Sequence, residues 1–382
     1  MDILAHWLIG ILIVFAALRL IVVLVNLLTR QWLRPHEVIA KTKVSILIPA
    51  RNEEGNIGIL LRNLVGIQRE AADHHSSLSI CEIIVYDDLS TDKTVKKAEE
   101  VKKAEEVNGF AGIKIIHGGE LPVGWLGKNF ACHKLAEAAT GEWLLFLDAD
   151  VQVSGTLVRD AIGYAQKKNL RLLSLFPQQV IKTPGEWLVV PLMNWILLSL
   201  LPLILVRTCS WTSFAAANGQ FMLFDAFIYK RFKWHSMVKS DPVEDIRISR
   251  IMKKRNFRTA TLLSGGQISC RMYESYGQAI NGFSKNIGQF FGNSLPWMLL
   301  FLLLTTFLPL FLILYLSLAP CALCLYFVLL LLIRIGTSLL SRQNPLTNLL
   351  YWLPQQIVLV VLAMKSILYR FGRKIDWKGR EI

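Results

Sequence analysis

The stretch Glu142-Trp-Leu-Leu-Phe-Leu-Asp-Ala-Asp-Val-Gln-Val153 joins a short apolar run to two carboxylates. Trp143 to Leu147 has the continuous apolar pattern of a strand buried on both faces of a sheet. Asp148 and Asp150 follow where such a strand leaves its sheet, and their i, i+2 spacing in extended chain turns both side chains to one side. In open α/β sheets, this carboxyl edge is where ligands bind.

Two neighbouring carboxylates repel each other unless a cation joins them. Mg²⁺ or Mn²⁺ binds one or two carboxylates together with substrate phosphate oxygens, so Asp148 and Asp150 are candidate metal ligands. The alternative is a polar turn in which the aspartates cap the following segment, and this is the commoner explanation of an isolated Asp-x-Asp pair. The neighbouring motifs must decide whether Asp148 and Asp150 form a metal site or a polar turn.

Strands and helices alternate from Lys43 to about Cys270, which predicts a parallel or mixed α/β sheet with helices on both faces. Val44 to Ile48 is an expected strand, followed by the polar cluster Pro49 to Glu54. Glu82 to Tyr86 is another, followed by Asp87 and Asp88. Because parallel strands end at one edge, Asp88 is expected on the same edge as Asp148.

Apolar residues concentrate toward the two ends of the chain, which has 382 residues, 53% of them hydrophobic. Ile3 to Leu28 is long enough to cross a bilayer, and basic residues follow it, so we expect an uncleaved anchor whose carboxyl side is cytoplasmic. The net charge of +14 suits an anionic membrane leaflet and a phosphate-bearing substrate. The basic residues lack aromatic interleaving, and with an anchor present we expect no nucleic-acid partner.

Four motifs in order resemble one enzyme family. They are Val44-Ser-Ile-Leu-Ile-Pro-Ala-Arg-Asn-Glu-Glu54, Asp87-Asp-Leu-Ser-Thr-Asp92, Gly124-Trp-Leu-Gly-Lys128 and Leu147-Asp-Ala-Asp150. Together they resemble the motifs of family-2 glycosyltransferases, in particular membrane-anchored enzymes that glycosylate lipids, such as carotenoid-acid glycosyltransferases and, more distantly, ceramide glucosyltransferases.

The resemblance implies a nucleotide-sugar-binding Rossmann-like domain of the GT-A type. It implies that Asp88 contacts the nucleoside, that Asp148 and Asp150 hold the metal on the diphosphate, and that Lys128 lies near the donor. The full expected donor-binding set is Pro49, Arg51, Glu53, Asp87, Asp88, Lys128 and Asp148. Leu89 stands where the family usually has glycine, which puts the turn after Asp88 in question because leucine tolerates a positive φ poorly.

The second half of the chain is expected to supply the acceptor side and the base. Ala217 to Phe221 resembles the family's acceptor segment, which implies roles for Gly219 and Gln220. Pro242-Val-Glu-Asp-Ile-Arg-Ile-Ser-Arg250 resembles the Glu-Asp motif of the base, so Asp245 is the expected base and Glu244 the second candidate. The alternative, that both are the acidic first turn of a helix running to Lys254, is compatible with this role.

The predicted organisation has five parts. They are an anchor (1–29), a cytoplasmic glycosyltransferase domain (43–270), an amphipathic connection (271–294), membrane helices (295–369) and a basic cytoplasmic tail (370–382). Residues 186–206 are long enough to cross, but one crossing would separate Asp148 from Asp245, so an interfacial or re-entrant insertion is expected. Leu295 to Ile333 is expected to cross twice, whereas Leu349 to Tyr369, with its polar interruptions, is not expected to cross.

The expected protein is thus an inverting glycosyltransferase of the plasma membrane that uses Mg²⁺ or Mn²⁺. It would transfer one sugar from a nucleotide sugar, with a UDP-sugar favoured, to a membrane lipid such as a carotenoid. The alternative is a non-catalytic transporter or scaffold with a degenerate domain of this type. The acidic motifs at Asp88, Asp148, Asp150 and Asp245 weigh against that alternative.

Overall fold

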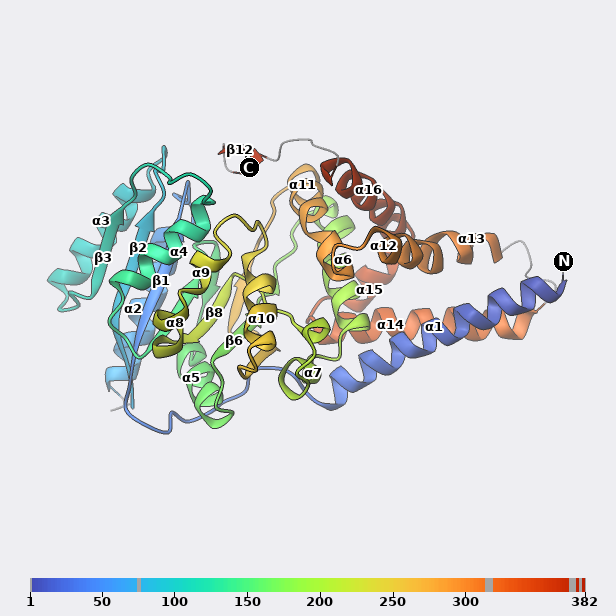
Figure 1. Cartoon of the computed structure of the whole chain (residues 1–382), viewed down its shortest axis with the longest axis horizontal. Helices are drawn as coiled ribbons and strands as arrows, with labels where there is room; N and C mark the ends of the chain where they lie inside the picture. Colours follow the sequence, from blue (N-terminus) through green and yellow to red (C-terminus); the bar gives the residue numbers. More distant parts are fainter. Residues whose placement is uncertain (1, 74–76, 313–318, 371–375, 378–379, 382) are drawn as a thin grey trace.

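In a computed structural model, the chain forms an α/β region and a helical region that extends away from it (Figure 1). The structure describes residues 2–73, 77–312, 319–370, 376–377 and 380–381. The long first helix, α1 (Asp2–Leu28), lies in the helical region beside α14 (Pro320–Leu340), although the two are at opposite ends of the sequence.

The central sheet has seven strands in the order β3-β2-β1-β4-β8-β6-β9. Their bounds are β1 Thr42–Ala50, β2 Leu78–Asp87, β3 Ile113–His117, β4 Trp143–Leu147, β6 Leu172–Phe176, β8 Phe221–Asp225 and β9 Thr259–Leu263. β1 to β4 are parallel where they pair, and β8 runs antiparallel to β4 and β6. A small sheet of β5 (Val151–Val153), β10 (Ile268–Cys270) and β7 (Gln178–Gln179) lies beside it. The predicted α/β class is confirmed.

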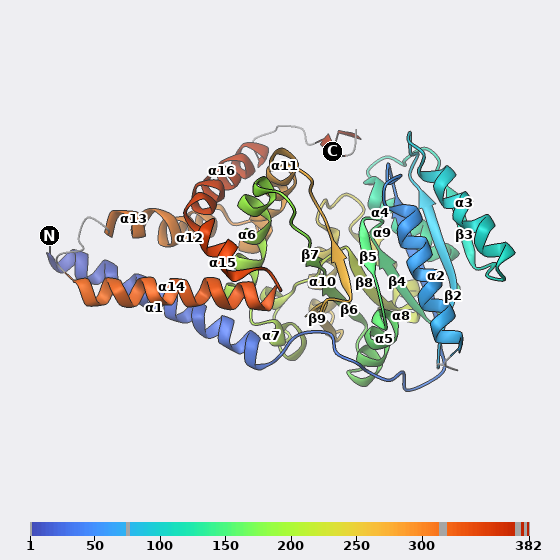
Figure 2. The ribbon, with the colours of Figure 1, turned by 180° about the vertical axis from the view of Figure 1, so that it is seen from behind.

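Helices cover both faces of the sheet because successive apolar residues of the strands point to opposite sides. Ile46 and Ile48 join a core with α2 and α5, whereas Leu47 joins a core with α4, α8, α9 and α10 (Figures 1 and 2). The bounds of the helices of this region are α2 Ile57–Asp73, α3 Thr94–Val107, α4 Gly127–Ala138, α5 Leu157–Lys167, α8 Ala226–Phe232, α9 Trp234–Met237 and α10 Glu244–Lys254.

The predicted site motifs meet at the carboxyl edge of the parallel strands. Asp148 follows β4, and Leu147 pairs with Phe221, so the antiparallel β8 begins at this same edge, immediately after Gln220. The pairing of β1 with β2 extends further than the sequence predicted, as far as Ala50 and Asp87, because the parallel ladder continues through both residues.

The backbone after Asp88 adopts the conformation that leucine disfavours. Leu89 has a φ of 55°, in the left-handed region, and its side chain is exposed. Arg51 stabilises this turn, because its Nη1 donates to the carbonyl oxygen of Asp88 at 2.5 Å. The turn that glycine would form in the family is therefore formed here by leucine under strain.

Replacing Leu89 by glycine is expected to stabilise the protein by about 0.5–1 kcal/mol, because relief of left-handed strain slightly exceeds the added freedom of the unfolded chain. The midpoint of thermal unfolding in detergent would measure this gain. Leu89→Ala is the matched control, since it removes the same exposed side chain but keeps the Cβ that causes the strain. Equal midpoints for the two variants would contradict the strain argument.

The helical region contains three helices long and apolar enough to cross a membrane among the residues that the structure describes: His6–Leu28, Pro320–Leu340 and Trp352–Tyr369. A fourth span is counted if the pair Tyr276–Phe291 and Leu295–Leu310, bent by 103°, is taken as one. The remaining bounds are α6 Pro184–Leu200, α7 Leu203–Thr208, η1 Thr212–Phe214, α11 Tyr276–Asn286, η2 Ile287–Phe291, α12 Leu295–Leu302, η3 Leu303–Phe307, α13 Leu308–Leu312, α15 Pro345–Leu350, α16 Trp352–Arg370, β11 Asp376–Trp377 and β12 Arg380–Glu381.

The helices of this region end at different residues from the apolar segments predicted from the sequence. α14 continues to Leu340, seven residues beyond the expected end at Ile333, and α16 packs against α6 and α11 (Figure 2). In the extension, Thr337 and Ser338 donate their hydroxyls to carbonyls four residues earlier, and Ser341, just after the helix, does the same, so these polar groups are satisfied by the helix backbone. Of the basic residues in the tail predicted to be cytoplasmic, Arg373, Lys374 and Lys378 lie outside the described residues.

The apolar segment between the two halves of the site is a broken helix. α6 ends at Leu200 and α7 begins at Leu203, and the break contains Pro202, which cannot donate a backbone hydrogen bond. Asn26 of α1 compensates: its Nδ2 donates to the carbonyls of Leu198 and Leu201 at 3.0 and 2.9 Å, and its Oδ1 accepts from the N–H of Leu203 at 2.8 Å. The polar residue that interrupts the anchor therefore satisfies the backbone of this break.

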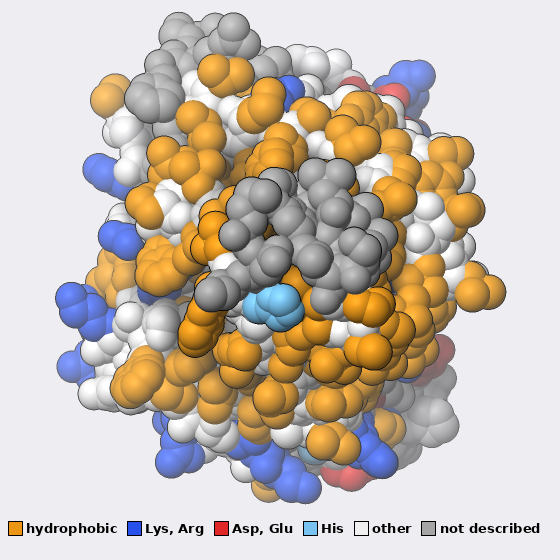
Figure 3. All heavy atoms as spheres, turned by 90° about the vertical axis from the view of Figure 1, so that its right-hand side faces the viewer, with side chains coloured by type: hydrophobic (Ala, Val, Ile, Leu, Met, Phe, Trp, Pro, Cys, Tyr) orange, Lys and Arg blue, Asp and Glu red, His pale blue; other side chains and the backbone are white. Residues whose placement is uncertain are grey.

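The segment after α1 joins the helices to the sheet. The backbone at Trp32 forms a parallel bridge with Leu263 of β9, and the Trp32 indole donates to the carbonyl of Leu340, the last residue of α14, at 3.1 Å. The end of the molecule farthest from the sheet is largely apolar on its surface, with Lys and Arg side chains toward the rim (Figure 3).

Candidate active site

Lys128 connects the two halves of the predicted site. It lies in the first turn of α4, and its Nζ is 2.9 Å from Asp148 Oδ1 and 3.0 Å from Asp148 Oδ2. The same Nζ is 3.0 Å from Glu244 Oε1, in the first turn of α10. Because one ammonium contacts both carboxylates, Asp148 and the Glu244–Asp245 pair lie on one side of the molecule, as a single active site requires.

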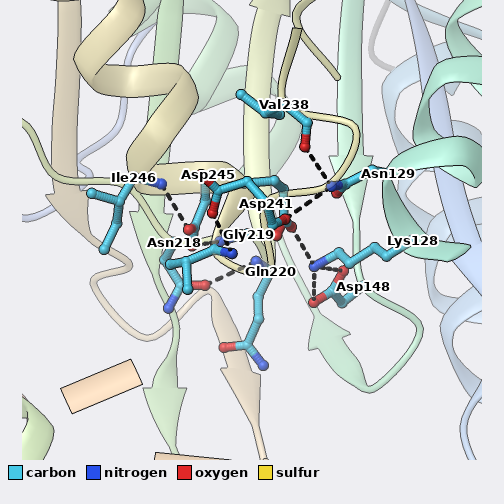
Figure 4. A network of polar contacts seen from close by, with 12 residues as sticks. Lys128, Asn129, Asp148, Asn218, Gly219, Gln220, Val238, Asp241, Asp245 and Ile246 are labelled. Carbon is cyan, nitrogen blue, oxygen red and sulfur yellow. Dashed lines mark hydrogen bonds and ion pairs between the residues drawn. The ribbon is translucent and has the colours of Figure 1, made fainter. Parts of the chain in front are cut away.

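Asp245 is held by backbone N–H groups, one of them from the segment predicted to border the acceptor. The N–H of Gly219 donates to Asp245 Oδ2 at 2.8 Å, and the N–H of Ile246 donates to Oδ1 at 2.7 Å (Figure 4). The sequence predicted both a helix start and a base at this position, and α10 does begin at Glu244, so the two descriptions are compatible in the structure.

The surroundings of the Asp245 carboxyl group stabilise its protonated, neutral form relative to an aspartate in water. Burial, and next the negative charge of Glu244, raise the pKa of Asp245 to about 7, against the opposing effects of its backbone donors and Lys128. Burial alone would lower the pKa of Lys128, but Asp148 and Glu244 outweigh it and raise that pKa well above its ordinary value. The site therefore contains a permanent cation and a carboxyl group that titrates near neutral pH.

Gly219 lies close to three charged side chains of the site. A Cβ there would lie 3.0 Å from both Lys128 Nζ and Glu244 Oε1, and 3.5 Å from Asp245 Oδ2. A glycine at this position thus lets the three charged groups approach one another.

Gly219→Ala is expected to reduce turnover up to about tenfold. The added Cβ would make the ends of Lys128 and Glu244 shift by a few tenths of an ångström, less than the roughly 1 Å displacement that can cost a hundredfold. Steady-state assay of the variant would measure the loss. At Gly277, at the start of α11, an added Cβ would meet no described atom within 4 Å, so Gly277→Ala is the control and should behave like the wild type. Equal turnover of both variants would show that the space beside Lys128 is not critical.

The other residues predicted to bind the donor, among them Asp88 for the nucleoside, form a second group at the ends of β1 and β2. The Arg51 guanidinium lies 3.9 Å from the Asp88 carboxylate. Asp87 accepts from the N–H of Ser90 at 3.2 Å, and Glu53 accepts from Asn56 Nδ2 at 2.8 Å. Asp87 and Glu53 therefore also stabilise their own loops. Pro49 lies within β1 beside them.

Asp150, the second carboxylate of the Asp-x-Asp pair, lies near the thiol of Cys270. Burial and the nearby Asp150 carboxylate raise the pKa of the Cys270 thiol well above its ordinary value. Gln220 Nε2 donates to Cys270 Sγ at 2.8 Å, and in Figure 4 the Gln220 side chain points away from Lys128. Sequence reasoning missed Cys270, because a lone cysteine at a strand end has no recognisable pattern.

A divalent ion on Asp148 and Asp150 is compatible with their chemistry. Within the described ranges, no three His, Cys, Asp or Glu side chains are grouped as a complete protein metal site. Mg²⁺ and similar ions in nucleotide enzymes need only one or two carboxylates, since phosphates and water supply the other oxygens. The two aspartates, hard oxygen donors separated by one residue, meet that requirement.

Asn129 is a positioning residue that the sequence interpretation missed. Its buried Nδ2 donates to the carbonyls of Val238 and Asp241, at 2.8 and 2.9 Å (Figure 4). It thereby fixes the start of α4 against the loop that leads into α10. The only available signal was its place directly after Lys128.

Comparison with known proteins agrees with this geometry. Residues 45–229 match the model of "Glycosyl transferase family 2". The chain resembles family-2 glycosyltransferases. The 4,4'-diaponeurosporenoate glycosyltransferase of Staphylococcus haemolyticus is 26% identical over 270 residues, 68% of this chain and 65% of that protein. The enzyme of the same name from Staphylococcus aureus (strain bovine RF122 / ET3-1) is 29% identical over 160 residues, which are 39% and 37% of the two chains. The matched regions thus span less than two thirds of these relatives.

Among solved structures, the mannosyltransferase PcManGT from Pyrobaculum calidifontis, in complex with GDP-Man and Mn²⁺, superimposes with a TM-score of 0.56. The sequences are 16% identical, and the match covers 95% of this chain and 99% of that one. This likeness concerns the fold, and it extends over the helical region as well as the α/β domain. The predicted GT-A fold is confirmed.

Proposed function

We propose that this protein is an inverting, metal-dependent glycosyltransferase that transfers one sugar from a nucleotide sugar to a membrane lipid. The observation that carries the proposal is the cluster in which Lys128 joins Asp148, at the carboxyl edge of the sheet, to Glu244, with Asp245 beside it. The family-2 match and the carotenoid-acid glycosyltransferases among the relatives support it.

The donor would bind along the carboxyl edge of the sheet. Asp88 and Arg51 would contact the nucleoside, with Pro49 beside them, while Asp87 and Glu53 hold the surrounding loops. Asp148 and Asp150 would hold a Mg²⁺ or Mn²⁺ ion, which when bound supplies positive charge to the diphosphate as it leaves. Lys128, in the first turn of α4, would add a second positive charge to the diphosphate.

Asp245 would act on the acceptor. In an inverting transfer, the acceptor oxygen attacks the anomeric carbon while the bond from that carbon to the diphosphate breaks. The proton of an alcohol acceptor passes to the Asp245 carboxylate, whose raised pKa makes it a stronger base than an ordinary aspartate. A carboxylic acid acceptor is already ionised at neutral pH and has no proton to give. Glu244 raises the basicity of Asp245 through its charge and is not needed as a second base.

The acceptor would be an apolar lipid, such as a carotenoid or another isoprenoid, that reaches the site from the membrane. The relatives' names specify a carotenoid acid, 4,4'-diaponeurosporenoate, as their substrate. α6 and α7, which separate Asp148 from Gly219 in the sequence, would lie at the membrane surface, and Gly219 and Gln220 would border the acceptor. The α/β domain would lie on the cytoplasmic side, where nucleotide sugars are found.

The test is chemical identification of product. Wild-type protein and the Asp148→Asn variant would be expressed in a host that makes carotenoid acids, and total lipids would be compared by mass spectrometry. A carotenoid shifted by the mass of one hexose, present only with the wild type, is the expected result. A lipid profile identical to that of the variant, together with no binding of UDP or GDP in Mn²⁺, would favour a transporter or scaffold.

A further inference from the structure

Lys128 occupies the place on Asp148 where a cation is expected. Its Nζ is within 3.0 Å of both oxygens of Asp148, so the ammonium lies across the carboxylate and not at one corner of it. The side chains of Lys128 and Asp148 are 24% and 22% exposed, which leaves the pair only partly screened by water. The carboxylate is therefore already neutralised by a group of the protein itself.

The ammonium cannot keep this position beside a bound divalent ion. A metal ion lies about 2.0–2.2 Å from a carboxylate oxygen, and an ammonium across the same carboxylate would then be a few ångströms from it. Two like charges at such a separation, in a partly buried site, repel strongly. Lys128 must move away from Asp148 if the ion is to bind well.

Other groups near Lys128 can hold its ammonium when it leaves Asp148. Its second partner, Glu244 Oε1 at 3.0 Å, is on the acceptor side and 9% exposed, so contact with Glu244 can persist when Asp148 is released. Gly219, which has no side chain, lies close to Nζ: a Cβ added there would be 3.0 Å from it. The phosphates of a donor, brought to the same edge of the sheet, would offer the ammonium a new anionic partner.

We propose that Lys128 acts as an internal substitute for the divalent cation: it holds Asp148 in the ligand-free protein and exchanges Asp148 for the donor's diphosphate when the cation binds. This inference rests on the proposed function, and it predicts how the nucleotide changes the affinity for the cation. The cation binds weakly by itself, and the nucleotide strengthens its binding, because the diphosphate takes Lys128 off Asp148. Binding of the two is thus cooperative through one side chain.

The experiment measures Mn²⁺ binding by electron paramagnetic resonance, with and without UDP, and with GDP in parallel. It uses the purified full chain and the variants Lys128→Met and Lys128→Gln. Without nucleotide, both variants are expected to bind Mn²⁺ about tenfold or more tightly than the wild type, since close charge pairs are worth at least that factor. The factor by which nucleotide tightens Mn²⁺ binding should fall in both variants.

Two controls separate charge from other effects. Lys134 lies on the same helix and pairs with Glu137 at 2.9 Å, away from the site, so Lys134→Met should match the wild type. Lys128→Arg keeps the positive charge and should bind Mn²⁺ as weakly as the wild type. Circular dichroism of each variant checks its fold, and Lys128→Gln, which retains polarity, serves if the Met variant is unstable.

The outcomes distinguish this inference from the proposed function. If nucleotide and Mn²⁺ bind to the wild type, but Lys128→Gln binds Mn²⁺ alone no more tightly, the substitution role is wrong and the proposed function stands. If the wild type binds neither UDP nor GDP with Mn²⁺, both are wrong. Tighter Mn²⁺ binding in Lys128→Arg as well would also overturn the inference, because charge would then not be the cause.

Discussion

Asparagine in place of Asp148 is expected to lower the rate of sugar transfer on the order of a thousandfold, the largest effect of any single change in the site. The amide has the same shape and still accepts hydrogen bonds, but it lacks the charge that binds a cation and that now binds Lys128. Asp150→Asn should have a similar effect, because the pair is proposed to hold the ion together. Turnover at saturating donor and Mn²⁺ is the measurement.

The control for this prediction is the residue that directly precedes the same strand. Glu142 is at the opposite end of β4, where its carboxylate accepts from the N–H of Lys43 at 3.0 Å, so Glu142→Gln should retain nearly full turnover. Thermal unfolding should show that Asp148→Asn and Asp150→Asn are folded. Near-normal turnover by folded Asp150→Asn would remove Asp150 from the proposed ion site.

Asp245→Asn is expected to reduce transfer to an alcohol lipid on the order of a hundredfold or more, because the variant has no base to receive the acceptor's proton. Transfer to a carotenoid-type carboxylic acid should fall much less, because that acceptor is ionised before it binds. Single-turnover rates with matched alcohol and acid lipids would measure both losses. Equal, small losses with both lipids would show that Asp245 is a helix-start residue and not a base.

The pH dependence gives a second measure of the same residue. A base works only when ionised, so wild-type transfer to an alcohol should rise with pH through about 7, the raised pKa of Asp245, and level off above it. Glu244→Gln removes the negative charge that raises this pKa, so the rise should move to lower pH. Asp241→Asn is the control, since Asp241 pairs with Arg247 at 3.8 Å, and it should leave the profile unchanged.

The sequence by itself determined the parts whose physics is local. Trp143–Leu147 is a strand in the structure as predicted, because an apolar run of this length is stable only when buried on both faces. Its position in an alternating series of strands and helices established the α/β class and placed Asp88 and Asp148 at one edge. The long apolar helices were equally evident, since a span of the membrane is a property of contiguous residues.

The tertiary structure alone decided which side chains meet. Nothing in the sequence indicated that Lys128 would contact Glu244, because that contact depends on how α10 docks beside α4, which Asn129 and the loop after Val238 control. Nor could the sequence show that Asn26 would satisfy the broken helix at Leu203. Such contacts join residues far apart in the chain, and their geometry follows from strand register and helix packing, which no local pattern records.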